Sequence, residues 1–316
     1  MIQTIAVLGA GTMGHGIAHT FALCGHPVSL YEVNDQVRTR VMDSMRQELD
    51  FMAENGLITP QQVDETLGRI TVYSDLRQAV AEADYVIEAA PEILALKQDM
   101  FQELDGYCKP SCILASNTSS LALEDMMEKV SPQRRQRMMV CHWYNPAHLM
   151  PIAELSFFGN MPEEIFKEVE ALYQGAGKQT VKVLRDVPGL VANRIQQGVA
   201  REVFSIIEQG IAAPEDVDKA LKFGPAFRYA TTGQLEVADM GGLDIWCTVG
   251  DNLLAVMDSR TDANPLLREK VAQGKLGMKS GEGFFTYPPE QVPALKNKFF
   301  KRLIQQLQVS KHYIAD

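Results

Sequence analysis

His142 and Glu154 are spaced so that they could work together in proton transfer. His142 follows the apolar run 138–141, and Glu154 lies twelve residues later, in a second apolar run at 149–155. A break at 145–146 separates the runs, which favours a hairpin-like pair that would lay the carboxylate beside the imidazole. A carboxylate bonded to one ring nitrogen fixes the tautomer and leaves the other nitrogen as a general base. The alternative is a surface histidine at a strand end, followed by a turn.

A glycine-rich segment near the N-terminus predicts a dinucleotide site. Gly9, Gly11 and Gly14 follow the apolar run 2–8 and precede a helical pattern. Glycines at this spacing permit a tight turn, close approach of a pyrophosphate and close helix packing, and the helix N-terminus attracts phosphate. Glu32 ends the second apolar run and could accept both ribose hydroxyls while repelling a 2′-phosphate, so we expect NAD rather than NADP. The alternative is a glycine turn in an unrelated α/β protein.

The elements that must position these residues alternate along the first part of the chain. The patterns predict strands at 2–8, 28–31, 85–88, 113–115 and 180–184, and helices at 13–24, 35–55, 94–104 and after Pro60 and Pro162. Alternation of this kind indicates a parallel sheet with right-handed crossovers. After 186–189 helical patterns dominate, with 284–287 as one further candidate strand and an amphipathic, basic helix at 288–308. We therefore expect an α/β domain at 1–185 followed by an all-helical domain at 186–316.

Composition narrows the class of protein. The 316 residues suffice for two domains, and the net charge of −10 argues against nucleic acid or an anionic membrane as a partner. No apolar run approaches the ~20 residues that span a bilayer, and no signal-type segment opens the chain. Five scattered cysteines suit a reducing compartment, so we expect a cytoplasmic enzyme. Cys108 and Cys112 have no second pair to complete a zinc site, which predicts structural thiols and no metal.

Several segments, in this order, resemble those of the L-3-hydroxyacyl-CoA dehydrogenase family. The matching segments are 9–14, 88–97, 116–121, 142–146, Glu154, 187–194 and 275–285. The resemblance covers nearly the whole chain. It implies a Rossmann-like NAD-binding domain, a helical substrate domain that forms a homodimer, and NAD-dependent oxidation of a hydroxyl group on a small-molecule substrate, as in fatty acid metabolism.

The resemblance also implies roles for single residues. His142 would be the base and Glu154 its orienting partner, while Ser119 and Asn193 would hold the substrate oxygen. The residues expected at the cofactor are Gly9, Gly11, Thr12, Met13, Gly14, Glu32, Glu92, Lys97, Asn145 and Lys279. Plainer alternatives exist, because Ser119 could cap the next helix, and Glu92 and Lys97 could be solvated. Asn is a poor interior helix former, which favours a functional role for Asn193.

Two departures from the family pattern leave the substrate open. The helical pattern 35–55 carries Asp43, Glu48, Asp50 and Glu54 against three arginines, and no lysine precedes Lys97. An acidic segment of this kind is poorly suited to bind polyanionic CoA. Aligned from Glu32, Glu48 and Asn55 stand where CoA-binding members offer serine and lysine. The second departure is the long turn around Arg228, which is similar to that of gulonate and carnitine dehydrogenases.

The substrate is therefore expected to be either a 3-hydroxyacyl-CoA or a free hydroxy acid. Arg228 could bind a substrate carboxylate through a bidentate fork, or be a solvated arginine. Trp143 replaces a more usual Phe, as in pyridine-carboxylate dehydrogenases, and is expected to help set the substrate. A non-catalytic NAD-binding protein is the competing class. The intact set of Ser119, His142, Glu154 and Asn193 argues against that class.

Overall fold

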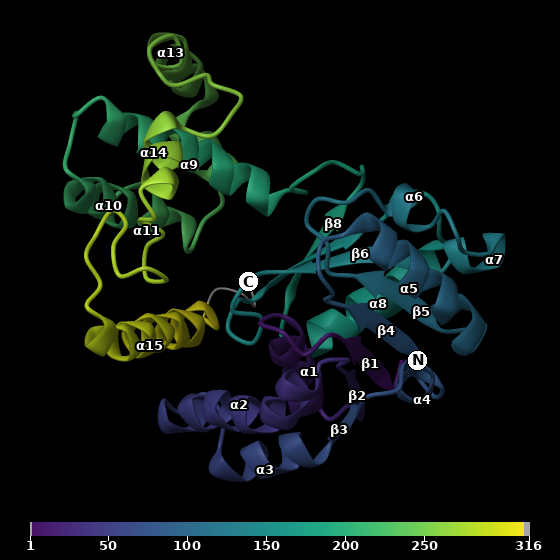
Figure 1. Cartoon of the computed structure of the whole chain (residues 1–316). Helices are drawn as coiled ribbons and strands as arrows, with labels where there is room; N and C mark the ends of the chain where they lie inside the picture. Colours follow the sequence, from purple (N-terminus) through teal and green to yellow (C-terminus); the bar gives the residue numbers. More distant parts are fainter. Residues whose placement is uncertain (1, 313–316) are drawn as a thin grey trace. The chain divides into compact units, whose positions relative to one another are not determined.

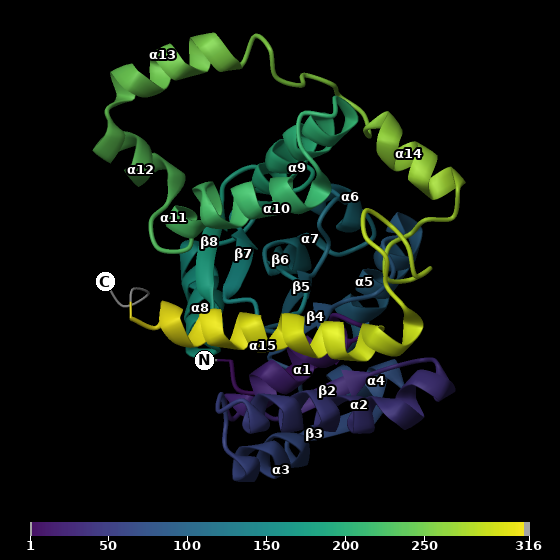
Figure 2. The ribbon, with the colours of Figure 1, turned by 90° about the vertical axis from the view of Figure 1, so that its left-hand side faces the viewer.

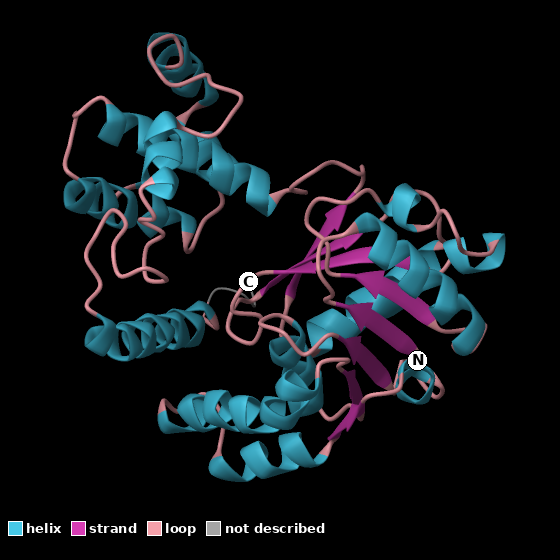
Figure 3. Cartoon of the chain, in the orientation of Figure 1, coloured by secondary structure: helices cyan, strands magenta, loops and turns pink. Residues whose placement is uncertain are grey.

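The computed structural model describes residues 2–312, and it divides into two compact units, residues 1–191 and 192–316. The first unit alternates strands with helices, and the second is helical, which confirms the predicted fold class (Figures 1 and 3). The strands are β1 Ile5–Leu8, β2 Val28–Tyr31, β3 Ile70–Tyr73, β4 Tyr85–Glu88, β5 Ile113–Ser116, β6 Met138–Trp143, β7 Ile152–Ser156 and β8 Gln179–Val183. The helices of the first unit are α1 Gly14–Leu23, α2 Asp35–Glu54, α3 Pro60–Gly68, α4 Leu76–Val80, α5 Leu94–Tyr107, α6 Leu123–Met126, α7 Pro132–Arg135 and α8 Glu163–Gly175.

All eight strands form one sheet in the order β3-β2-β1-β4-β5-β6-β7-β8. Every neighbouring pair is parallel except β6 and β7, which are antiparallel. The strand order reverses between β1 and β4, and ligands of open α/β sheets bind in the crevice beyond the carboxyl ends of strands at such a point. The fold therefore places the glycine segment, which follows β1, where a cofactor is expected.

Side chains alternate between the two faces of the sheet, and each face is covered by helices. Leu8, Val86 and Leu114 belong to a buried cluster with residues of α4, α5 and α6. On the opposite face, Phe21 of α1 packs edge-on against Tyr85 of β4, with ring centroids 6.2 Å apart. The core is thus two apolar layers with the sheet between them.

Trp143 is part of this core, which corrects its expected role at the substrate. Its side chain is 1% exposed, and its ring lies 5.2 Å from that of Tyr173 in α8. The indole N–H donates to the Tyr173 hydroxyl at 3.0 Å, and that hydroxyl also lies 2.8 Å from the Tyr85 hydroxyl. Adjacent residues of a strand point to opposite faces, so Trp143 packs on the face of the sheet covered by α1 and α8, and His142 lies on the other face.

Some short elements were not predicted from the sequence. These are β3, α4, α6 and α7, none of which is longer than five residues. The three helices are too short for a periodic pattern to develop, and β3 is an edge strand with a single buried residue, so no apolar run marks it. The candidate strand 284–287 is wrong for the described structure, since Thr286 makes only an isolated bridge with Glu282.

The second unit consists of helices joined by loops. Its elements are α9 Ala192–Glu208, α10 Pro214–Phe223, α11 Pro225–Tyr229, α12 Gln234–Gly241, α13 Leu243–Leu253, α14 Pro265–Ala272, the 3-10 helix Pro289–Gln291 and α15 Val292–Ser310. Phe204 of α9 stacks on Phe284 with ring centroids 5.6 Å apart. Within this unit α12 and α13 extend away from α9 and α10 (Figure 2), and α13 buries none of its residues. Across residues 2–312, none of the helices combines the length and apolar character needed to cross a membrane.

The shared hydroxyl of Tyr173 predicts a specific loss of stability. Tyr173→Phe would leave the buried indole N–H of Trp143 without its partner and remove one hydrogen bond from the hydroxyl of Tyr85. We expect the free energy of unfolding, measured by urea denaturation, to fall by about 1–3 kcal/mol. Tyr73→Phe on the half-buried edge strand β3 is the control, with an expected change within about 0.5 kcal/mol. Equal effects of the two substitutions would contradict the shared hydrogen bonds.

Candidate active site

The glycine segment between β1 and α1 has the geometry of a phosphate-binding loop. Gly9 has a φ of +93°, and a Cβ there would lie 3.0 Å from the carbonyl oxygen of Ala89. A Cβ at Gly14 would lie 1.7 Å from the carbonyl oxygen of Gly9, so no other residue fits. A Cβ at Gly11 would meet nothing within 4 Å. The first and third glycines are therefore required by the fold, while the second leaves the backbone open to a ligand.

Glu32 follows β2 and faces this loop. Its carboxylate accepts hydrogen bonds from the backbone N–H groups of Ala10 and Asn34, each at 2.8 Å. Thr12 is exposed on the loop, and Met13 occupies the N-cap position of α1. A carboxylate offers about four lone-pair sites, so two remain for ribose hydroxyls. The open loop and the oriented acid fit NAD.

Arg38 is engaged by other groups and does not create a site for a 2′-phosphate. Arg38 donates to the backbone carbonyl of Glu32 at 3.0 Å and forms an ion pair with Asp35. A pocket of about 290 Å³ next to this segment is lined by Ala10, Asn34 and residues of α1 and α2, among them Arg40. The choice between the dinucleotides therefore depends on Glu32, which stands where the 2′-substituent of the ribose would lie. The charges at the end of β2 therefore favour NAD over NADP.

Lys97 is buried, so the alternative of a solvated lysine is wrong. Its side chain is 1% exposed, and its ammonium lies 2.8 Å from Glu88 and 2.9 Å from Glu92. Glu88 ends β4, is fully buried, and also accepts from the Ala90 N–H at 2.9 Å and from the Ser116 hydroxyl. Sequence reasoning missed Glu88, although an acid that ends a buried strand is itself a signal.

Glu92 organises the loop that carries Ser119. Its Oε1 accepts from the backbone N–H groups of Ser119 and Ser120 at 3.2 and 3.3 Å, and from the hydroxyl of Thr118. Burial alone would raise the pKa of Glu92, but the hydroxyls of Thr118 and Ser120 and the ammonium of Lys97 lower it to about 2. Glu92 is therefore an ionised anchor and not a freely solvated carboxylate.

Ser119 does not cap the following helix, so that alternative is wrong. Helix α6 has Ala122 at its N-cap and no side-chain cap. The carbonyl of Ser119 instead accepts from the N–H of Gly189 at 2.9 Å. The hydroxyl of Ser119 therefore takes no part in starting α6, and its role toward a substrate stays a prediction.

The predicted pairing of His142 with Glu154 is confirmed. The two residues are directly opposite in the antiparallel ladder of β6 and β7, and His142 Nδ1 lies 2.9 Å from Glu154 Oε2. Glu154 is fully buried, and its Oε1 accepts from the N–H of Val191 at 2.8 Å. A carboxylate accepts only, so Nδ1 carries the proton and Nε2 keeps its lone pair in the neutral ring. This geometry provides a general base, whose catalytic role stays a prediction.

The donor to Glu154 is held by a strained turn. Gly189 has a φ of +81°, and Leu190 has a φ of +48°, which is uncommon for a residue other than glycine. Leu190 is buried in the apolar cluster beneath the sheet. Burial of its side chain thus offsets the strain, and the turn orients the N–H of Val191 toward Glu154.

Two further residues beside His142 were missed in the sequence. The ring of Tyr144 lies 5.4 Å from that of His142, and burial together with the charge of Glu154 raises the pKa of Tyr144 to about 12. Asn117, which follows β5, accepts from the backbone N–H of Trp143 at 2.8 Å. This bond joins the Ser119 loop to the strand that carries His142.

The remaining predicted residues lie outside the glycine loop and the His142–Glu154 pair. Asn145 is exposed after β6. Asn193, Arg228 and Lys279 belong to the second unit, where Arg228 is exposed on α11 and Lys279 lines a pocket after α14. Asn193 lies in the first turn of α9, not in its interior, so low helix propensity gives no argument for a functional role. The roles of these four residues stay predictions.

A dinucleotide fold with a carboxylate-oriented imidazole at the edge of its sheet is typical of nicotinamide-dependent dehydrogenases as a class. Residues 4–187 match the model of the 3-hydroxyacyl-CoA dehydrogenase NAD-binding domain, and residues 189–287 match that of the C-terminal domain. The chain belongs to the 3-hydroxyacyl-CoA dehydrogenase family, as the sequence motifs indicated, and its cofactor is NAD.

Individual relatives span nearly the whole chain. One is the 5-formyl-3-hydroxy-2-methylpyridine 4-carboxylate 5-dehydrogenase of Mesorhizobium japonicum, 33% identical over 96% of this chain and 97% of the relative. Another is a probable 3-hydroxybutyryl-CoA dehydrogenase of Bacillus subtilis, 37% identical over 90% and 98%. A crystal structure of the pyridine-carboxylate enzyme superposes with a TM-score of 0.90 at 32% identity, covering 98% and 99%. The (S)-3-hydroxybutyryl-CoA dehydrogenase of Ralstonia eutropha gives 0.74 at 31% identity, covering 91% and 100%.

Glu32 should determine the choice of dinucleotide. Glu32→Ala removes the ribose acceptor and the charge that repels a 2′-phosphate. We expect the ratio of kcat/KM for NAD to that for NADP to fall at least about tenfold, or 1.4 kcal/mol. Glu54→Ala, at the exposed end of α2, is the matched control. A ratio that stays unchanged in Glu32→Ala would contradict this assignment.

Proposed function

We propose that this chain oxidises a CH–OH group of a small hydroxy acid, with His142 as the general base and NAD as the hydride acceptor. The observation that carries the proposal is the 2.9 Å bond between His142 Nδ1 and the buried Glu154. It fixes the tautomer in which Nε2 accepts a proton. Membership of a dehydrogenase family supplies the reaction class.

The residues of the chain would divide the work of the reaction. Bound NAD would supply the hydride acceptor. His142 Nε2 takes the hydroxyl proton, and the negative charge of Glu154 stabilises the imidazolium that forms. Ser119 and Asn193 would donate hydrogen bonds to the reacting oxygen as charge develops on it. A well-placed base of this kind contributes roughly 10²–10⁴ in rate.

A free carboxylate is favoured as the substrate over a CoA thioester. The pyridine-carboxylate dehydrogenase superposes with a TM-score of 0.90, against 0.74 for the hydroxybutyryl-CoA enzyme. Asp43, Asp50 and Glu54 are exposed on α2, and Arg46 pairs with Asp64. This acidic helix would repel the phosphates of CoA.

A 3-hydroxyacyl-CoA is the second candidate substrate. The probable 3-hydroxybutyryl-CoA dehydrogenase of Bacillus subtilis shares 37% of aligned residues, more than the 33% of the pyridine-carboxylate enzyme. The exposed guanidinium of Arg228 could then face a phosphate in place of a carboxylate. In that case a role in fatty acid metabolism follows.

The second unit supports a homodimer. Helix α13 carries exposed apolar side chains, among them Ile245, Trp246, Val249 and Leu253, and buries none of its residues. The hydrophobic gain from covering such a face is about 25 cal/mol per Å², and a second copy of the chain would cover it. We therefore propose a homodimer through this unit.

The cysteines support a cytoplasmic location. All five are free thiols, and Cys24 and Cys247 are exposed. Free exposed thiols are typical of reducing compartments.

The non-catalytic alternative would require an oriented general base to be maintained without use.

His142→Gln tests the base. The substitution keeps a polar side chain but removes the proton acceptor, so we expect turnover with a 3-hydroxy acid or its 3-oxo product to fall at least 100-fold. The Kd for NADH, measured by fluorescence, should change by less than about threefold, since the glycine loop is untouched. A variant that retains more than a tenth of the wild-type rate would refute the role. His312→Gln, near the other end of the chain, is the control.

Arg228→Met tests the carboxylate anchor. We expect the KM for a free acid, such as 3-hydroxybutyrate or a formyl-pyridine carboxylate, to rise at least about tenfold, with little change for 3-hydroxybutyryl-CoA. Lys222→Met, an exposed cation on the neighbouring α10, is the matched control. The free acid should also have the higher kcat/KM in the wild type. An unchanged KM for the acid would exclude Arg228 as the carboxylate anchor. A higher kcat/KM for the thioester would favour the CoA alternative.

A further inference from the structure

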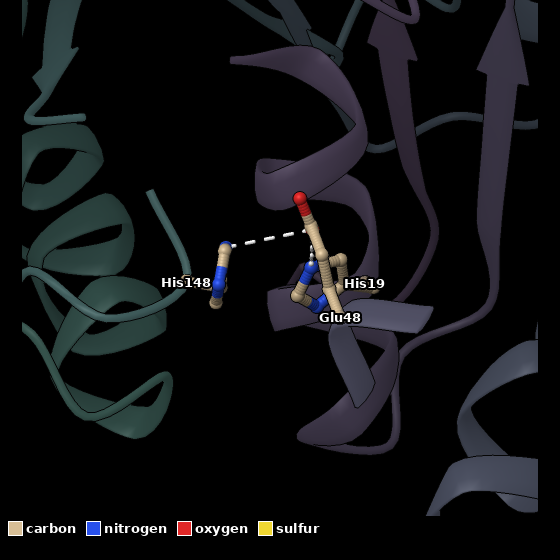
Figure 4. A group of neighbouring side chains, drawn as sticks. All are labelled: His19, Glu48 and His148. Atoms are coloured by element: carbon tan, nitrogen blue, oxygen red, sulfur yellow. Dashed lines mark hydrogen bonds and ion pairs between the residues drawn. The ribbon is translucent and has the colours of Figure 1, made fainter. Parts of the chain in front are cut away.

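A cluster of three histidines and one glutamate lies between α1, α2 and the loop that follows β6. Glu48 of α2 is the centre, with His19 Nε2 at 3.0 Å from its Oε2 and His148 Nδ1 at 3.6 Å from the same oxygen (Figure 4). One ligand atom from each of these three residues lies within 4.8 Å of the others. His15 contacts the other oxygen, Oε1, at 2.9 Å. The proposed reaction uses none of these four residues.

The hydrogen bonds fix the charge of His15. Its Nδ1 lies 2.7 Å from the carbonyl of Gly11 and its Nε2 lies 2.9 Å from Glu48, and both partners only accept. Both ring nitrogens must therefore carry protons. Burial opposes the charge, but the bonds to Glu48 and Gly11 outweigh it and raise the pKa of His15. His15 thus orients Glu48 from one side as an imidazolium.

The other two histidines offer nitrogen ligands, since metals bind the neutral imidazole. The ring of His19 is fully buried and the side chain of His148 is 7% exposed, so both are largely shielded from water. In the structure His19 Nε2 donates to Glu48, because a carboxylate only accepts, and among the described residues nothing bonds His19 Nδ1. The proton can therefore move to Nδ1 when an ion replaces that hydrogen bond, which leaves the Nε2 lone pair for the ion. One nitrogen of each histidine and one oxygen of Glu48 are then available to a single ion.

We propose that His19, Glu48 and His148 form a binding site for a divalent transition-metal ion of the zinc type. Two imidazole nitrogens and one carboxylate oxygen, with a fourth position for water, are a common zinc ligand set. Ligands at 2.0–2.2 Å from a tetrahedral ion are separated by about 3.3–3.6 Å. The distances from Glu48 to the two imidazoles, 3.0 and 3.6 Å, are close to this, and all three ligand atoms lie within 4.8 Å of one another, so small side-chain shifts would bring them around one ion. The side chain of Glu48 is 30% exposed and gives the ion a path from solvent.

The ion would tie together three segments that are distant in sequence. Helix α1 starts at the phosphate-binding loop, and a Cβ on Gly16 would approach Ala147 to 3.2 Å, so α1 already packs against the loop that carries His148. His15 links the site to the carbonyl of Gly11 in the cofactor loop. The ligand residues supply one negative charge, and His15 would act as a supporting partner for the carboxylate.

Zinc binding to the full-length, untagged chain tests the proposal. After dialysis against a chelator, calorimetric titration with Zn²⁺ at pH 8 should give one site with a Kd of about 10 μM or tighter. We choose pH 8 because burial lowers the pKa of Lys178 to about 7, and this lysine bonds the carbonyl of Ala147, next to His148. Above that pKa the amine is mostly uncharged and does not repel the ion. Zinc at 100 times the Kd should raise Tm by about 4 °C or more. Absence of saturable one-to-one binding would overturn the site.

Variants locate the ion. Glu48→Gln and His148→Gln should each weaken zinc binding at least tenfold, whereas His26→Gln, outside the cluster, should not change it. Circular dichroism and NADH binding check that each variant is folded. Co²⁺ in the unaltered chain should give the intense visible band of four- or five-coordination, which decides the question even if a variant fails to fold. A loss below tenfold in both folded variants, or only weak octahedral cobalt absorption, would leave the cluster as hydrogen bonds alone.

Discussion

A buried carboxylate needs a donor for each oxygen, and the first unit is built so that Glu154 has both. One oxygen takes the N–H of His142 across the antiparallel pair β6 and β7, and the other takes the backbone N–H of Val191. Loss of either donor would cost about 1–3 kcal/mol, more for a charged group. The antiparallel step from β6 to β7 brings His142 opposite this carboxylate, and the strained turn at Leu190 supplies its second donor.

Strand β6 places the proposed base, His142, on one face of the sheet and the core residue Trp143 on the other. His142 faces Glu154, while Trp143 is bonded to Tyr173 and lies under the ammonium of Lys178, 4.6 Å from its ring. Lys178 also donates to carbonyls of the loop that follows β6. The imidazole is therefore held by the core itself, and its position does not depend on a mobile loop. Rigid placement of this kind is what a general base needs.

Patterns that are local in sequence predicted most of the fold and part of the site. The helix expected at 35–55 is α2 at Asp35–Glu54, and the hairpin pattern placed His142 opposite Glu154. Lys97 could not be assigned, because its burial arises only when the ends of β4 and α5 meet. The second donor to Glu154, the backbone N–H of Val191, has no side-chain signal in the sequence. The His19–Glu48–His148 cluster joins three segments more than twenty residues apart, which no local pattern encodes.

The hydrogen bond from the N–H of Val191 to Glu154 also bears on where the NAD-binding domain ends. The match to the NAD-binding-domain model stops at residue 187, four residues before the N–H that bonds Glu154. A chain truncated at 187 would retain every strand of the sheet yet lose the buried cluster residue Leu190 and one donor to the carboxylate. The smallest piece that keeps the His142 environment intact therefore extends through Val191, so the boundary set by hydrogen bonding differs from the boundary set by sequence similarity.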